Sequence, residues 1–62
     1  MPITPKEMVK QLKKYGFEEI SQKGSHLKMQ NEKTGKVVII PMHSKDIAKG
    51  TEQAILKQAG LK

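Results

Sequence analysis

The sequence predicts an α+β domain in which a helix, three antiparallel strands and a second helix follow one another along the chain. Apolar residues recur at helical spacing near both ends of the 62-residue chain, and they alternate with polar residues between short turn sequences in its middle. Strands joined by short turns pair antiparallel, and helices pack on a sheet through one apolar face. We therefore expect one domain over residues 1–62, with both helices on one face of a three-stranded sheet and the opposite face open.

The first helix is predicted from its start signal, the sequence Thr4-Pro5-Lys6-Glu7. The Thr4 side chain can cap the helix, proline suits the first helical position, and Glu7 completes a capping box. Gly16 is expected to end the helix in a left-handed conformation. Three apolar residues form its inward face: Met8, Val9 and Leu12.

The middle of the chain predicts three strands, at residues 17–22, 25–31 and 36–41, with turns at 23–24 and 32–35. In the second strand, alternation directs two apolar side chains into the core and three polar ones onto the open face. The core pair is Leu27 and Met29, and the open-face residues are His26, Lys28 and Gln30.

The register of the third strand has two alternatives, because both of its faces are apolar. A three-residue loop before it would place Val37 and Ile39 in the core, whereas a four-residue loop would place Val38 and Ile40 there. Gly35 suits the bulge position of a three-residue hairpin loop, so we favour the first register. In either case one β-branched pair stays on the open face.

The end of the chain predicts an irregular segment at residues 42–49, with room for one helical turn, and then the second helix. This helix should begin with Thr51 as its cap and Glu52 in its first turn, and Gly60 should end it. Its inner face consists of Ile55, Leu56 and Ala59.

The chain is strongly basic, with a net charge of +6 from twelve lysines, six acidic residues and no arginine. Such a charge favours a polyanionic partner, nucleic acid first, over a merely soluble surface. Lysine lacks the bidentate fork that reads guanine edges, so contacts to the phosphate backbone are expected. On the outer side of the first helix, a solvated lysine face is favoured over an RNA-phosphate track. Its lysines are Lys6, Lys10, Lys13 and Lys14.

The absence of cysteine excludes a disulfide framework and a thiolate metal site. The lack of cysteine, together with the lack of an apolar signal region and of an apolar run of membrane-spanning length, favours a cytoplasmic location. Two histidines with one nearby carboxylate, Asp46, are too few ligands for a metal site. A domain of this length also has no room for a pocket that encloses a cofactor.

The sequence Gly24-Ser25-His26 is the main candidate for chemistry. His26 is expected on the open face, with Lys23 and Lys28 on either side of it. Imidazole can take a proton from a ribose 2′-hydroxyl or give one to a leaving 5′-oxygen, and lysines can stabilise charge on the phosphate. The tripeptide is weakly specific, however, and the pattern alone favours an exposed strand histidine without a role.

His43 has three interpretations: a second acid–base group, a hydrogen-bonding residue that fixes the loop, or a residue with neither role. The structural role is favoured, because His43 precedes Ser44, which suits a cap or turn. The apolar residues left on the open sheet face are better explained by a protein partner than by RNA.

Three segments that run through nearly the whole chain carry a family resemblance. They are Lys6-Glu7-Met8-Val9 to Leu12 with Tyr15-Gly16-Phe17; Gln22-Lys23-Gly24-Ser25-His26 with Lys28; and Ile40-Pro41-Met42-His43, Asp46-Ile47, Gly50-Thr51 and Ile55 to Leu61. In this order they resemble the HicA (YcfA-like) family of type II toxin–antitoxin toxins. The third segment is the most specific, because its Pro-x-His, Gly-Thr and closing Leu-Lys-Gln-Ala-Gly-Leu sequences recur together.

The resemblance implies a fold of the double-stranded-RNA-binding-domain type and an mRNA interferase, a ribosome-independent and metal-independent endoribonuclease. It implies that His26 is catalytic, and we expect RNA-binding residues around it at Lys23, Gly24, Ser25 and Lys28. A cognate HicB-type antitoxin would bind in a hetero-oligomer and mask this region, and no cofactor is expected. The alternative, from charge and element order, is a non-catalytic double-stranded-RNA-binding module.

Overall fold

The computed structural model describes residues 3–43 and 45–62, so the turn expected at Ser44 and the first two residues of the chain lie outside the described part. The elements are helix α1 (Pro5–Lys14), strands β1 (Phe17–Lys23), β2 (His26–Asn31) and β3 (Val37–Pro41), and helix α2 (Lys49–Gln58). This α-β-β-β-α order confirms the predicted α+β fold of the double-stranded-RNA-binding-domain type.

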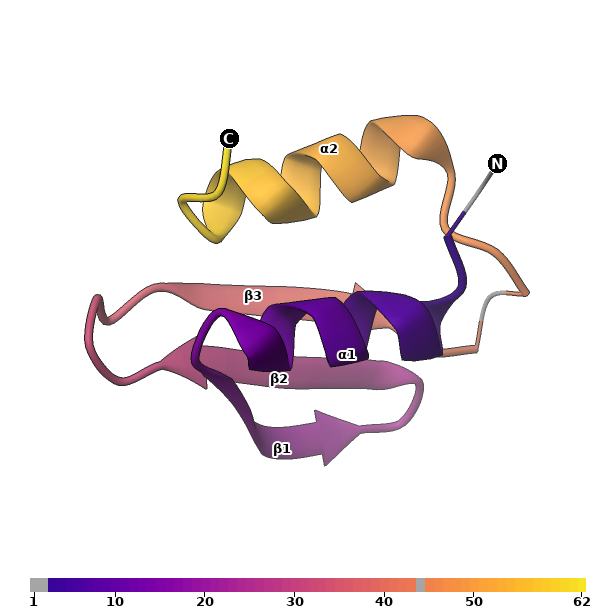
Figure 1. The fold of residues 1–62 in the computed structure, drawn as a ribbon. Coiled ribbons are helices and arrows are strands. Elements are labelled where there is room, and N and C mark those ends of the chain that lie inside the picture. The colour runs from indigo at the N-terminus through magenta and orange to yellow at the C-terminus, as the bar shows by residue number, and fades with distance from the viewer. Residues whose placement is uncertain (1–2, 44) are drawn as a thin grey trace.

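The strands form one antiparallel sheet in the order β1-β2-β3, and both helices pack on the same face of it (Figure 1). Buried side chains from both helices, from all three strands and from the segment before α2 make a single core. The core contains Met8, Val9, Leu12, Phe17, Leu27, Met29, Val38, Ile40, Ile47, Ile55, Leu56 and Ala59. The other face of the sheet is open to solvent, as predicted.

The start of α1 is fixed by the predicted capping box. The backbone N–H of Glu7 donates to the Thr4 hydroxyl oxygen at 3.2 Å, and the backbone N–H of Thr4 donates to the Glu7 carboxylate at 3.0 Å. The Thr4 backbone N–H, and then the Thr4 side chain, hold the pKa of Glu7 below its ordinary value, because hydrogen bonds to a carboxylate favour its charged form. At the other end Gly16 adopts the expected left-handed conformation, with φ of 96°.

The register between β2 and β3 differs from the favoured prediction. Met29 pairs with Val38 and Leu27 pairs with Ile40, so Val38 and Ile40 enter the core and each is 0% exposed. The alternate pair lies on the open face, where Val37 is 37% and Ile39 is 44% exposed. The preference for Val37 and Ile39 as core residues was therefore wrong, and the four-residue loop is the correct alternative.

The cause of this register is the side chain of Asn31, the last residue of β2. Its Oδ1 accepts from the backbone N–H groups of Lys33 at 2.9 Å and Thr34 at 3.3 Å, which begins the loop directly after Asn31. The backbone carbonyl of Asn31 accepts from the N–H of Gly35 at 2.7 Å, and the backbone N–H of Asn31 donates to the carbonyl of Lys36 at 2.9 Å. Gly35, which the sequence suggested as the bulge residue of a three-residue loop, is instead the last residue of the four-residue loop and has a left-handed φ of 75°.

The segment between β3 and α2 is irregular, as predicted, and it is tied to the rest of the domain at both of its ends. The N–H of Met42 donates to the carbonyl of Ser25 at 2.6 Å, and the N–H of Ile47 donates to the carbonyl of Ile3 at 2.7 Å. Ile47 is buried, with an exposure of 1%. Fixing Ile47 in this way determines where the chain can turn into the second helix.

The second helix begins two residues before the predicted cap, so the assignment of Thr51 as N-cap was wrong. Ala48 is the N-cap residue and its side chain makes no capping hydrogen bond. Its carbonyl accepts from the N–H of Glu52 at 2.8 Å, which makes Thr51 part of the first turn. Glu52 lies in that first turn as expected, and Gly60, with φ of 77°, follows the helix.

Matched substitutions in β3 test the register. Ile40→Val should lower the free energy of unfolding by about 0.5–1.5 kcal/mol, because it removes a fully buried methylene. Ile39→Val, the same change one residue earlier, should alter it by less than about 0.5 kcal/mol, because an exposed site loses little packing. Urea unfolding followed by circular dichroism measures both values, and the reverse order of effects would indicate the alternative register.

Candidate active site

His26 is the first residue of β2 and is exposed on the face of the sheet that the helices leave open. Across the sheet it pairs with Lys23 of β1 on one side and with Pro41 of β3 on the other. The next residue, Leu27, is buried with an exposure of 3%. The pleat of β2 therefore fixes the outward direction of the imidazole, as the alternation predicted.

An irregularity in β1 brings a lysine next to His26. Glu19 pairs with Met29 and Ser21 pairs with Lys28, so Ile20 is an extra residue in β1. An extra residue shifts the following side chains by one position and so exchanges the faces of the sheet. Without the extra residue Ile20, the side chains of Ser21 and Lys23 would point to the face of the sheet that the helices cover. Nothing in the sequence pattern predicted this bulge.

A hollow of about 410 Å³ on the open face collects side chains from all three strands. Its lining residues are Ser21, Lys23, His26, Lys28 and Ile39. The hollow thus offers one imidazole, two ammonium groups, one hydroxyl and an apolar side chain. This set suits a phosphate diester, because the cations can pair with its charge and the imidazole can exchange a proton beside it.

The turn before His26 has a backbone role. Gly24 has φ of 61°, and a Cβ atom added to it would meet nothing within 4 Å, so its glycine serves the left-handed conformation rather than a tight contact. Ser25 is half-buried, and its carbonyl accepts from the N–H of Met42. Neither residue lines the hollow, whereas Lys23 and Lys28 of the expected RNA-binding set do.

His43 lies beside His26, although the two residues are far apart in the sequence. Their ring centroids are 6.4 Å apart and their planes meet at 68°. Both side chains are exposed. The hydrogen bonds that hold the loop at Met42 and Ile47 are backbone bonds, so they do not use the His43 ring. The structure thus brings together the two histidines that the sequence presented separately.

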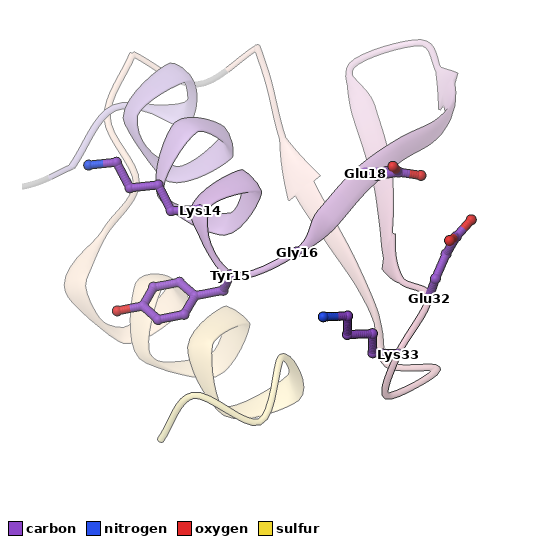
Figure 2. Close-up of a pocket in the computed structure, with 6 residues that line it drawn as sticks. All are labelled: Lys14, Tyr15, Gly16, Glu18, Glu32 and Lys33. Atoms are coloured by element: carbon purple, nitrogen blue, oxygen red, sulfur yellow. The ribbon is translucent and has the colours of Figure 1, made fainter.

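A second hollow lies at the opposite end of the sheet, where α1 passes into β1, and it does not present a comparable set of groups. Its lining residues are Lys14, Tyr15, Gly16, Glu18, Glu32 and Lys33. Figure 2 shows that the carboxylates of Glu18 and Glu32 point away from the Tyr15 ring. The lining carries equal numbers of lysines and glutamates, so this hollow has no charge preference for a polyanion.

The lysines of α1 are exposed and belong to the helical side of the domain. Lys13 pairs with Glu19 at 2.8 Å between Nζ and Oε2, and Lys10 and Lys14 border a hollow beside Glu7. The sheet separates this lysine face from the hollow that contains His26. A ligand that binds on the open face would therefore not contact the lysines of α1.

Over residues 3–43 and 45–62, no three histidine or acidic side chains gather in a way that could hold a metal ion. In the same part of the chain, no helix has the length and hydropathy needed to cross a membrane. The open face also has exposed apolar side chains, including Val37 and Ile39, and Ile20 at the bulge is 47% exposed.

A family model described as the HicA toxin of bacterial toxin–antitoxin systems matches residues 5–61. The chain belongs to the HicA toxin family. This HicA chain is therefore the toxin component of a toxin–antitoxin system, which implies an antitoxin as its partner. No curated protein matches it at a significant level. The family match covers every helix and strand described above, including the strand that bears His26 and the segment that bears His43.

Proposed function

We propose that this HicA toxin is an endoribonuclease that cleaves mRNA on the open face of its sheet, with His26 as a general acid–base residue. The observation that carries the proposal is the exposed imidazole of His26 in a hollow that also contains Lys23 and Lys28. Family membership supports a toxin, and an enzyme that destroys mRNA is a direct way for so small a protein to arrest growth.

The proposed reaction is an internal transesterification. The ribose 2′-hydroxyl loses its proton to a base and its oxygen attacks the adjacent phosphorus. The new bond joins phosphorus to the 2′-oxygen, and the bond from phosphorus to the 5′-oxygen of the next nucleotide breaks while that oxygen gains a proton. The products are a 2′,3′-cyclic phosphate and a 5′-hydroxyl, and no metal ion is required. His26 serves one of these two proton transfers.

Lys23 and Lys28 would hold the phosphate while its charge develops. Lys23 pairs with His26 and Lys28 pairs with Ser21, so the two lysines lie at diagonally opposite positions on neighbouring strands and could approach different non-bridging oxygens. Lysine acts as a point charge, so this arrangement favours contact with the RNA backbone over recognition of particular bases. The net charge of +6 would assist the encounter with RNA.

The antitoxin partner, which we propose is of the HicB type and forms a hetero-oligomer with the toxin, would cover this same face. Ile39 lines the hollow and is 44% exposed, and Val37 is exposed next to it along β3. A partner that buries these side chains gains hydrophobic free energy and at the same time blocks access to His26.

A non-catalytic double-stranded-RNA-binding module is the second candidate. The exposed lysines of α1 favour it, because they offer a charged surface that is independent of His26. The two candidates use opposite sides of the domain, and substitutions on each side can therefore separate them.

His26→Ala should abolish RNA cleavage, and the loss should be at least 100-fold because one proton transfer is left without its donor or acceptor. The side chain is exposed, so the variant should retain its circular dichroism spectrum and unfolding midpoint. Cleavage of total RNA in buffer with a chelator measures the activity, and arrest of growth on expression provides a second assay. A folded His26→Ala variant with full activity would show that the site is assigned wrongly.

Charge removal on each side of the sheet separates the two candidates. In the inactive His26→Ala background, Lys23→Ala or Lys28→Ala should weaken binding of single-stranded RNA and lower the salt slope by about 0.7 for each lost phosphate contact. Lys14→Ala removes the same charge from the helical side and should have a smaller effect. Fluorescence anisotropy at several salt concentrations measures these constants. A larger effect from Lys14→Ala would favour the non-catalytic module.

A further inference from the structure

We propose that His43 is a second catalytic residue and that it carries out the proton transfer that His26 does not. This inference rests on the proposed ribonuclease function, and it names the partner group within the same site. The observation behind it is the placement of the two rings, whose centroids are 6.4 Å apart on the surface of the domain.

The backbone holds the two histidines in this arrangement. His26 begins β2 directly after Ser25, and His43 lies two residues after the end of β3 at Pro41. The carbonyl of Ser25 accepts from the N–H of Met42 at 2.6 Å, so a hydrogen bond joins the residues that immediately precede the two histidines. The pairing of His26 with Pro41 continues the ladder to the same point. The proximity of the rings thus follows from the sheet register.

The chemistry requires two groups at two positions. The attacking 2′-oxygen and the leaving 5′-oxygen lie roughly in line on opposite sides of the phosphorus. Removal of a proton from the first and delivery of a proton to the second each need a hydrogen-bond distance of about 2.6–3.2 Å. The centroids of the two rings are 6.4 Å apart and both side chains are exposed, so both imidazoles can reach the same phosphate diester when it lies across them on the surface.

The other side chains beside His26 are less suited to the second transfer. Lys23 and Lys28 provide the positive charge that the phosphate needs, and Ser21 provides an aliphatic hydroxyl. Histidine is the side chain that takes up and releases protons most readily near neutral pH. His43 is the other histidine of the chain. One imidazole accepts the 2′-proton, the other donates to the 5′-oxygen, and hydrolysis of the cyclic phosphate would restore their protonation states.

The geometry leads to a mechanism in which the same phosphate contacts four side chains. Lys23 and Lys28 pair with its non-bridging oxygens, and His26 and His43 face its attacking and leaving oxygens. His43 lies outside the hollow that contains the other three. The RNA strand would therefore leave the hollow across the end of the sheet, between the β1–β2 turn and the segment after β3.

The test compares two substrates with two variants. One substrate is a short RNA with a single site cleaved by the wild-type protein, and the other carries sulfur in place of the leaving 5′-oxygen at that site. Sulfur leaves without a proton, so it replaces a missing general acid but not a missing general base. His43→Ala should slow cleavage of the ordinary RNA by about 100-fold to 10,000-fold. The sulfur substrate should restore cleavage in only one of the two variants, His43→Ala or His26→Ala. The variant that recovers is the one that lacks the general acid.

The controls separate a loss of catalysis from a loss of folding. His43→Gln provides a second variant, and circular dichroism with unfolding midpoints confirms that each variant is folded. Lys45→Ala, a change in the same loop, should keep the wild-type rate at saturating protein concentration. A folded His43→Ala variant with the wild-type rate would overturn the inference while the ribonuclease function stands. Equal recovery, or no recovery, of both histidine variants on the sulfur substrate would also overturn it. Absence of cleavage by the wild-type protein would instead reject the proposed function.

Discussion

The hydrogen bonds of the Asn31 side chain are the interactions on which the packing of the hairpin and the first helix depends. Besides closing the β2–β3 loop, its Nδ2 donates to the carbonyl of Tyr15 at 3.0 Å, so one buried amide joins the end of α1 to the hairpin. Asn31 is 7% exposed, and loss of its amide would leave buried polar groups without partners. Through the loop it selects the four-residue connection, which turns Val38 and Ile40 inward and leaves Ile39 outside, beside His26.

The small size of the domain explains why the candidate site lies on an open surface. Two helices of ten residues each cover one face of the sheet, and a chain of this length buries only about 60% of its unfolded surface. The uncovered face is where a long RNA strand can lie without entering a pocket. It also leaves apolar side chains exposed, and an antitoxin that binds there would stabilise the folded state by mass action.

Local signals in the sequence were sufficient where the responsible contacts are local. The capping box of Thr4 and Glu7, the end of α1 at Gly16 and the exposure of His26 all depend on residues within a few positions. The register of β3 is an exception: Asn31 closes the loop through local bonds to Lys33 and Thr34, but Gly35 suits either loop length and directed the prediction to the shorter one. The start of α2 was predicted wrongly for a non-local reason, since the backbone pairing of Ile47 with Ile3 precedes it. The bulge at Ile20 and the proximity of His43 to His26 likewise arise only when the strands pair.

The most direct measurement of the proposed chemistry uses the substrate rather than the protein. A short RNA that the wild-type toxin cleaves at one position is compared with the same RNA bearing a single 2′-deoxynucleotide immediately before that bond. Attack by the 2′-oxygen predicts that the deoxy substrate is bound but not cleaved, and that the ordinary RNA yields a 2′,3′-cyclic phosphate and a 5′-hydroxyl. Cleavage of the deoxy substrate, or a product with a 5′-phosphate, would contradict the proposed attack by the 2′-oxygen, in which His26 serves one of the two proton transfers.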